Sequence, residues 1–219
     1  MDLTYLASLA PALLKGLAVT LRLFALTLAF SLPLGLLWTL GSLSRVPPLR
    51  WFSRLYILVF RGTPLMLQLF FIYYGLPFLG LTFDRFPAAV LTFSLNYAAY
   101  FAEIYRGGIQ SIDHGQREAA KTLGFTPWQT MRHILLPQAI GRVLPPICNE
   151  TITLVKDTAL VTAIGVGELL KAAQGAVNRD VDIAAYGVAA CLYLLLTLAF
   201  TAVSRRLEKR FNRYQKKEA

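Results

Sequence analysis

Residues 184–203 read AAYGVAACLYLLLTLAFTAV, twenty consecutive residues without a charged side chain. A helix needs about 20 apolar residues to cross the hydrocarbon core of a bilayer, so this stretch predicts a transmembrane helix. The composition of the whole chain agrees. Of its 219 residues, 56% are hydrophobic and 16% are charged, with a mean hydropathy of +0.52, whereas soluble domains have about 45–50% apolar and about 25% charged residues. This excludes a free cytosolic enzyme, a secreted disulfide scaffold and a disordered chain, and it leaves a helical membrane protein.

Four more apolar stretches lie upstream, although each is interrupted by polar residues. We therefore predict an all-α, polytopic membrane protein with five transmembrane helices in a single domain over residues 1–219. The predicted spans are about 17–40, 52–79, 87–109, 145–166 and 184–203. Residues 3–10 are too short to cross the bilayer, so we expect a separate interfacial or packed helix there. No internal repeat is visible in the sequence.

The basic residues are concentrated in three of the segments that flank these spans. The net charge is +10, from 22 Lys and Arg against 12 Asp and Glu. Fifteen of the 22 lie in the loop after the first span, in the segment between the third span and the fourth, in the tail 204–219, or in the adjoining span ends. The positive-inside rule then puts the N-terminus outside and the tail in the cytoplasm. A basic tail in that place faces lipid headgroups, and it calls for no nucleic acid partner.

The cytoplasmic segment of about residues 110–137 carries two helix-start signals. Residues 113–124 read DHGQREAAKTLG. Here Asp113 and the glutamine three residues later have the spacing of a capping pair, and the final glycine is a natural helix stop. Residues 126–129 read TPWQ, the order of a capping box with proline at the first helical position. The sequence therefore predicts two short helices outside the bilayer, broken at residues 124–125.

This segment resembles the EAA loop of ABC importer permeases. The family pattern is Glu-Ala-Ala, a glycine four residues later, and Ile-x-Leu-Pro after nine more residues. Here it stands as Glu118-Ala119-Ala120, Gly124 and Ile134-Leu135-Leu136-Pro137, with every spacing met. Other blocks resemble the polar amino-acid branch of that family, whose members carry histidine, arginine, glutamine, glutamate or cystine. These blocks are RGTPLMLQ at 61–68, AAYFAEI at 98–104, RGGI at 106–109 and LVKDTAL at 154–160.

The resemblance implies a five-span permease of the type I ABC importer kind in the bacterial cytoplasmic (inner) membrane. Its implied partners are an identical or similar second permease, two ATP-binding cassette ATPase subunits, and an external binding protein that delivers a polar amino acid. It also implies that the Glu-Ala-Ala helix couples the chain to the ATPase. The coupling residues would be Gln116, Glu118, Ala119, Ala120, Leu123 and Gly124.

Sequence motifs for chemistry within this chain are missing. No Gly-x-x-x-x-Gly-Lys-Ser/Thr phosphate loop occurs, so we expect a transport subunit that is not an enzyme, binds no cofactor, and leaves ATP and Mg²⁺ to its partner. Cys148 and Cys191 lie in apolar stretches without metal-ligand spacing, so we expect no metal site. An intramembrane enzyme is disfavoured, because His114 and His133 fall in the cytoplasmic segment and no catalytic pattern occurs. An ATP-independent secondary amino-acid carrier or channel stays open as the alternative function.

Polar side chains inside the predicted spans are candidates for a substrate pathway, because such groups are costly in hydrocarbon. The candidates are Arg61, Gln68, Asn96, Tyr100, Glu103, Asn149 and Glu150. Arg61 and Glu103 either form a structural ion pair or meet the charged ends of an amino acid. For Arg61, the glycine and proline that follow favour a structural role at a bend. Asn96 either joins helices by hydrogen bonds or lines the path, and Glu150 favours a substrate with a basic or amide side chain.

Overall fold

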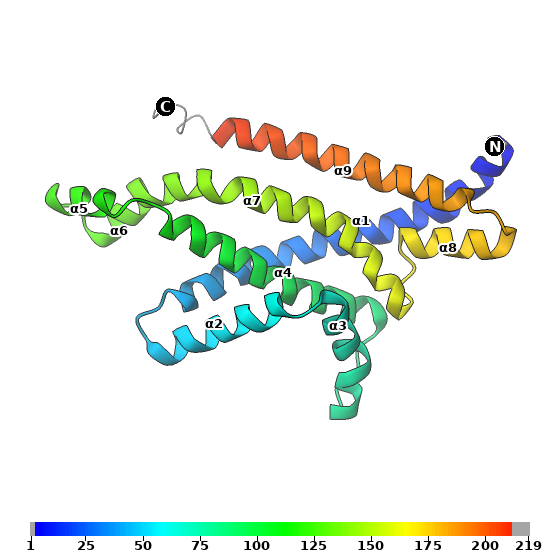
Figure 1. Ribbon diagram of the computed structural model, residues 1–219, viewed down its shortest axis with the longest axis horizontal. Coiled ribbons are helices and arrows are strands. Elements are labelled where there is room, and N and C mark those ends of the chain that lie inside the picture. The colour runs from blue at the N-terminus through cyan, green and yellow to red at the C-terminus, as the bar shows by residue number, and fades with distance from the viewer. Residues whose placement is uncertain (1–2, 212–219) are drawn as a thin grey trace.

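The computed structural model describes residues 3–211, and every regular element in that range is helical. The α-helices are α1 (Leu3–Ser42), α2 (Pro47–Gly62), α3 (Leu65–Phe70), α4 (Arg85–Gln110), α5 (His114–Thr122), α6 (Pro127–Thr130), α7 (Leu136–Asp157), α8 (Leu169–Asp180) and α9 (Ala184–Phe211). Short π- or 3₁₀-helical turns are η1 (Phe71–Gly75), η2 (Leu76–Leu79), η3 (Met131–Leu135) and η4 (Thr158–Ile164). The helices form an elongated bundle with α5 and α6 at one end (Figure 1). The start of α1 and the turn between α8 and α9 lie at the opposite end.

Helix α4 forms the centre of the core. Its Phe93 and Phe101 are fully buried, in one hydrophobic cluster with residues of α1, α3, α7 and η4. Helix α1 packs closely against α4 at Gly35, where an added Cβ would lie 2.8 Å from the Cβ of Phe101. Small residues permit such close helix contacts in membranes, where van der Waals packing drives association. The substitution of this glycine by a larger residue would push α1 and α4 apart.

Helix α1 is longer than the sequence suggests. A separate helix was expected over residues 3–10, but a single continuous helix runs from Leu3 to Ser42. The expected packing is present, because Leu9 and Leu13 are buried in a cluster with residues of α8 and α9, but the expected separation from the first span is wrong. A segment as short as residues 3–10 would not be a stable helix by itself, but packing against other helices stabilises it. Forty residues of helix measure about 60 Å, so α1 extends beyond the hydrocarbon core of about 30 Å or crosses it at a tilt.

The predicted second span, 52–79, is a sharply bent pair of helices. The axis turns by 105° between Pro47–Gly62 and Leu65–Leu79. Thr63 and Pro64, between the two, both have extended backbones. Proline lacks an N–H and disfavours helix in the residue before it, which accounts for the break. The bend expected beside Arg61 is confirmed, and α3 points away from the bundle (Figure 1).

The predicted fourth span, 145–166, also has different bounds in the structure. Helix α7 already begins at Leu136, so Pro145 and Pro146 lie inside it. Prolines are tolerated in membrane helices where neighbouring groups satisfy the freed carbonyls. After α7 and η4 the chain turns by 53° into α8, a helix that the sequence reading did not predict. The turn passes through Gly165, whose positive φ of +79° suits glycine.

The number of membrane crossings is bounded by length and composition. Helices α1 and α9 are each long and apolar enough to cross a membrane, and the two bent pairs raise the number to at most four in the described residues. Helix α4, the predicted third span, is not among them, and 12 of its 26 residues are buried inside the protein. Five spans therefore stay a prediction. Of the predicted tail 204–219, the part over 212–219 lies outside the described residues.

Candidate functional site

Two of the pathway candidates, Gln68 and Asn96, hold the break between α2 and α3. In a continuous helix the carbonyl of Phe60 would accept from the N–H of residue 64, which is a proline. The Gln68 Nε2 amide donates to this carbonyl at 2.9 Å, and the Asn96 Nδ2 amide donates to it at 3.0 Å. Asn96 also donates to Gln68 Oε1 at 3.0 Å, and Gln68 donates to Thr63 Oγ1 at 2.7 Å. Both amides are buried, and their hydrogen bonds stabilise the bend.

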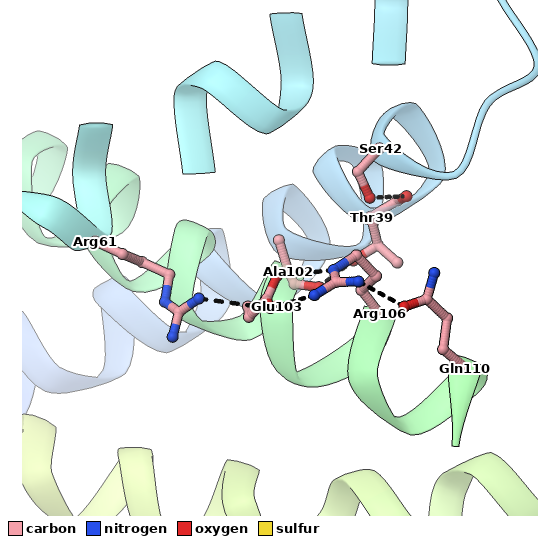
Figure 2. Close-up of polar contacts among 7 residues, drawn as sticks. All are labelled: Thr39, Ser42, Arg61, Ala102, Glu103, Arg106 and Gln110. Carbon is pink, nitrogen blue, oxygen red and sulfur yellow. Dashed lines mark hydrogen bonds and ion pairs between the residues drawn. The ribbon is translucent and has the colours of Figure 1, made fainter. Parts of the chain in front are cut away.

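Arg61 and Glu103 form an ion pair, and Arg106 joins it from the next turn of α4 (Figure 2). The Arg106 Nε donates to Glu103 Oε2 at 2.9 Å, and its Nη2 donates to Glu103 Oε1. The Arg106 Nη1 also donates to Gln110 Oε1. Arg61 reaches the same carboxylate from α2 at 3.7 Å, with its guanidinium 5.5 Å from the centre of the Tyr100 ring. Sequence reasoning placed Arg106 among the cytoplasmic basic residues and missed this contact, although an acidic and a basic residue three apart on a helix predict it.

Arg61, Tyr100 and Glu103 stand between two cavities and line both of them. The α2-side cavity has a volume of about 620 Å³ and is also lined by Arg54 and Arg106. The α7-side cavity has a volume of about 450 Å³. Its remaining walls come from α4 and α7 and include Glu150. Both volumes fall in the range of about 300–1,000 Å³ that is usual for small-molecule sites.

The adjacent candidates Asn149 and Glu150 lie in different surroundings. Neighbouring residues on a helix point about 100° apart. Glu150 lines the α7-side cavity and has no hydrogen bond or ion pair within residues 3–211, whereas Asn149 is exposed and lines neither cavity. About two turns after Glu150, Asp157 accepts a hydrogen bond of 2.7 Å from the Tyr97 hydroxyl on α4. Of the seven pathway candidates, four thus share the cavity walls: Arg61, Tyr100, Glu103 and Glu150.

A further acidic residue, Glu168, is fully buried, and the sequence reading missed it. Its carboxylate accepts from the hydroxyls of Thr162 at 2.5 Å, Tyr193 at 2.6 Å and Thr20 at 3.4 Å. It also accepts from the backbone N–H groups of residues 170 and 171, at 2.9 and 2.8 Å, as the N-cap of α8. We call these groups the Glu168 node. An acidic residue before an apolar run is a helix-start signal that could have indicated the cap.

The predicted coupling segment contains one separate short helix, α5, whereas the second predicted helix, α6, is the first turn of a helical run that continues through η3 into α7. Asp113 caps α5 by accepting from the N–H of Gly115 at 2.7 Å. Gly124 lies just after the end of α5 and has a φ of +77°. Thr126 and Gln129 form the predicted capping box in both directions, at 3.3 and 2.8 Å. These elements follow from contacts between residues that are close in sequence.

The exposed part of this segment lies at the end of the bundle (Figure 1). Five of the six predicted coupling residues are exposed, and the sixth, Ala120, is buried. The predicted cap partner Gln116 makes a different contact, because its side chain accepts from Gln138 of α7 at 3.4 Å. Leu123 and Trp128 are 75% and 70% exposed. These two side chains place apolar area on an otherwise polar, exposed end of the bundle.

Comparison with known proteins identifies the family. The family model "Binding-protein-dependent transport system inner membrane component" matches residues 31–213. The chain belongs to this family. Its members are inner-membrane components of transport systems that depend on a binding protein, as the description states. The chain is thus a transport subunit of an ABC system, and such permease subunits carry no ATPase of their own.

Individual relatives match this permease over almost their whole length. The L-cystine transport system permease protein TcyB of Bacillus subtilis is 41% identical over 93% of this chain and 88% of its own. The arginine transport system permease protein ArtQ of the same organism is 42% identical, over 91% and 92%. Among solved structures, "Crystal structure of an amino acid ABC transporter with histidines" superposes with a TM-score of 0.90 at 36% identity, covering 96% of this chain and 99% of that one.

Proposed function

We propose that the chain is the permease of an ATP-driven importer for a polar amino acid. The observation that carries this proposal is the identity of about 40%, over nearly the full length, to permeases named for cystine and arginine transport. The solved amino-acid transporter supports it with the same fold at 36% identity. Glutamine, arginine or lysine, histidine, glutamate and cystine are the substrate candidates.

The α7-side cavity is the proposed substrate position. It brings the cation Arg61 and the unpaired carboxylate of Glu150 to the walls of one space. An α-amino acid carries a carboxylate, which suits Arg61, and an ammonium, which suits Glu150. Glu103 is occupied by two arginines, which leaves Glu150 as the carboxylate that receives the ammonium or a basic side chain. Gln68 and Asn96 do not line this cavity, but their hydrogen bonds fix the bend that follows Arg61 and so help to position its side chain.

The helices α5 and α6 are the proposed contact with the ATPase. Their exposed residues include Glu118, Ala119 and Leu123, at the end of the bundle opposite the start of α1. This arrangement supports a cytoplasmic α5 and an external N-terminus. Two ATPase subunits would bind ATP and Mg²⁺, no cofactor would bind this chain, and a second permease, identical or similar, would complete the pathway. An external binding protein would deliver the amino acid.

Uptake by the complete assembly tests the proposal. The permease, its ATPase and its binding protein are reconstituted in proteoliposomes and given radiolabelled glutamine, arginine, histidine, glutamate and cystine. We expect uptake of at least one amino acid, dependent on ATP and on the binding protein. Uptake by the permease alone, without ATP, would support the carrier alternative instead.

Gly124 tests the coupling role separately. Its φ of +77° is open to glycine and asparagine but costs a β-branched residue about 1–2 kcal/mol. Gly124→Val should abolish transport while membrane insertion stays normal, and Gly124→Asn should retain transport. Normal uptake by Gly124→Val would argue strongly against docking through this turn.

A further inference from the structure

The ion pair of Arg61 and Glu103 forms part of the wall that separates the α2-side cavity from the α7-side cavity, since both residues line both spaces. We propose that this ion pair is a gate, which the carboxylate of the amino acid opens by taking Arg61 away from Glu103. The proposal rests on the proposed function, because it requires a substrate with a carboxylate. It goes beyond that function by stating what Arg61 binds before the substrate arrives, namely the carboxylate of Glu103.

The two arginines hold Glu103 unequally, and this makes Arg61 the movable partner. Arg106 donates two hydrogen bonds to the carboxylate, one to each oxygen, and a third to Gln110 (Figure 2). Arg61 makes an ion pair of 3.7 Å and no hydrogen bond within residues 3–211. Bidentate, charge-assisted contacts are the stronger kind. Glu103 therefore stays with Arg106 when Arg61 moves.

Arg61 also has room and a second partner. It lies in the last turn of α2, directly before the break held by Gln68 and Asn96, and its side chain is 40% exposed. The next residue, Gly62, has open space where a Cβ would lie. The face of the Tyr100 ring supports the guanidinium at 5.5 Å from its centre, an attraction that does not depend on Glu103. The guanidinium can thus leave the carboxylate without losing every favourable contact.

The charge of the cluster favours an incoming anion. Two guanidiniums share the single carboxylate of Glu103, and Arg54 adds a third cation to the α2-side cavity. A substrate carboxylate would supply the missing negative charge and match the planar fork of Arg61. Glu103 competes for the same guanidinium in the empty protein. Because of this competition, the apparent affinity for the substrate equals the intrinsic affinity multiplied by the fraction of the protein in which Arg61 is free.

Equilibrium binding to the purified permease–ATPase assembly tests the gate. The probes are radiolabelled L-arginine, L-glutamine, L-histidine and L-cystine, in detergent and without the binding protein. Glu103→Gln removes the competitor and should tighten binding about twofold to fivefold, the range to which partly exposed ion pairs convert. Arg61→Gln should weaken it at least about tenfold. Arg61→Lys should recover part of the loss, because lysine keeps the charge but not the bidentate fork.

The control is Arg50→Gln, which removes the same charge from α2 about three turns earlier. Arg50 lines neither cavity, so binding should match the wild type. Binding by Glu103→Gln that is unchanged or weaker would overturn the gate, and so would normal binding by Arg61→Gln. If Arg61→Gln does not co-purify with the ATPase, the binding of Arg61→Lys is the deciding measurement. The gate predicts weaker binding by Arg61→Lys than by the wild type, whereas a purely structural ion pair predicts equal binding. If the wild type binds none of these four amino acids and also fails to bind radiolabelled L-glutamate, the proposed function fails first, and the gate fails with it.

Discussion

Glu103 and Glu168 are two carboxylates in one helical bundle, held in opposite ways. Glu168 is fully buried and accepts hydrogen bonds from five neutral donors on α1, η4, α8 and α9. Glu103 faces two cavities, and its side chain is 29% exposed. Its partners are two arginines on α2 and α4, of which one is bound only loosely. Five hydrogen bonds hold the carboxylate of Glu168 in one position, whereas a ligand can replace the contact of Glu103 with Arg61.

The two surroundings suit different roles: one holds the protein together, and the other is open to a ligand. Neutral donors from four elements satisfy a buried carboxylate without attracting a free anion or cation. Sharing one carboxylate between two guanidiniums leaves a positive charge for an incoming ligand. We therefore expect substitutions at the Glu168 node to change stability, and substitutions at Glu103 to change binding.

Glu168→Ala should have the largest effect on stability. It leaves the hydroxyls of Thr20, Thr162 and Tyr193 and two helix N–H groups without their acceptor, at a cost of about 3 kcal/mol or more. The measurement is the thermal unfolding midpoint of the purified assembly in detergent. Asp180→Asn is the control, because it removes the charge that pairs with Arg179 but keeps an oxygen that accepts from the Tyr5 hydroxyl, and it should leave the midpoint unchanged. An equal, small shift for both variants would mean that the Glu168 node does not stabilise the bundle.

Asn96→Leu should follow, with a loss of about 1–3 kcal/mol, because it takes a donor from the Phe60 carbonyl and from Gln68 Oε1. The matched control is Asn149→Leu, the same substitution at an exposed position of α7. Denaturant unfolding, followed by tryptophan fluorescence, measures both variants. If the two variants unfold alike, the break between α2 and α3 does not depend on these amides.

The sequence predicts local features of this molecule well. The caps of α5 and α6 are formed by residues two or three positions apart, and the bend after Arg61 follows from Pro64. Helix α9 begins at Ala184, where the charge-free stretch begins. In each case the residues that determine the structure are visible within one or two turns, so a single window of sequence contains the whole cause.

Features that depend on distant residues could not be predicted. Asn96 donates to a carbonyl 36 residues away, so its spacing gave no sign that it serves a helix break. Thr20 lies 148 residues from Glu168. The continuous α1 depends on its packing against α8 and α9, and α8 was itself not predicted. The cavity walls combine α2, α4 and α7, which is why four pathway candidates meet there and three do not.

Tyr193→Phe should cost about 1 kcal/mol, the value of a single hydrogen bond, since it removes one of the five donors of the Glu168 node. The ring stays, so packing is preserved. Tyr186→Phe on the same helix is the control, because its side chain is 39% exposed. The thermal midpoint should fall between those of the wild type and Glu168→Ala. A loss as large as that of Glu168→Ala would mean that the node fails as a unit and does not add its contacts one by one.

Glu103→Gln should have the smallest effect on stability. Its ion pair with Arg61 is partly exposed on both sides, and such pairs are worth about 1 kcal/mol or less. The contact with Arg106 is an i,i+3 pair on one helix, worth about 0.2–0.5 kcal/mol, and the amide oxygen of glutamine still accepts one of its two hydrogen bonds. Yet this variant should change substrate binding most clearly, because it frees Arg61. Thermal unfolding and amino-acid binding measured on one preparation give both values. A large loss of stability without tighter binding would make Glu103 a structural carboxylate like Glu168, and the contrast between the two would be lost.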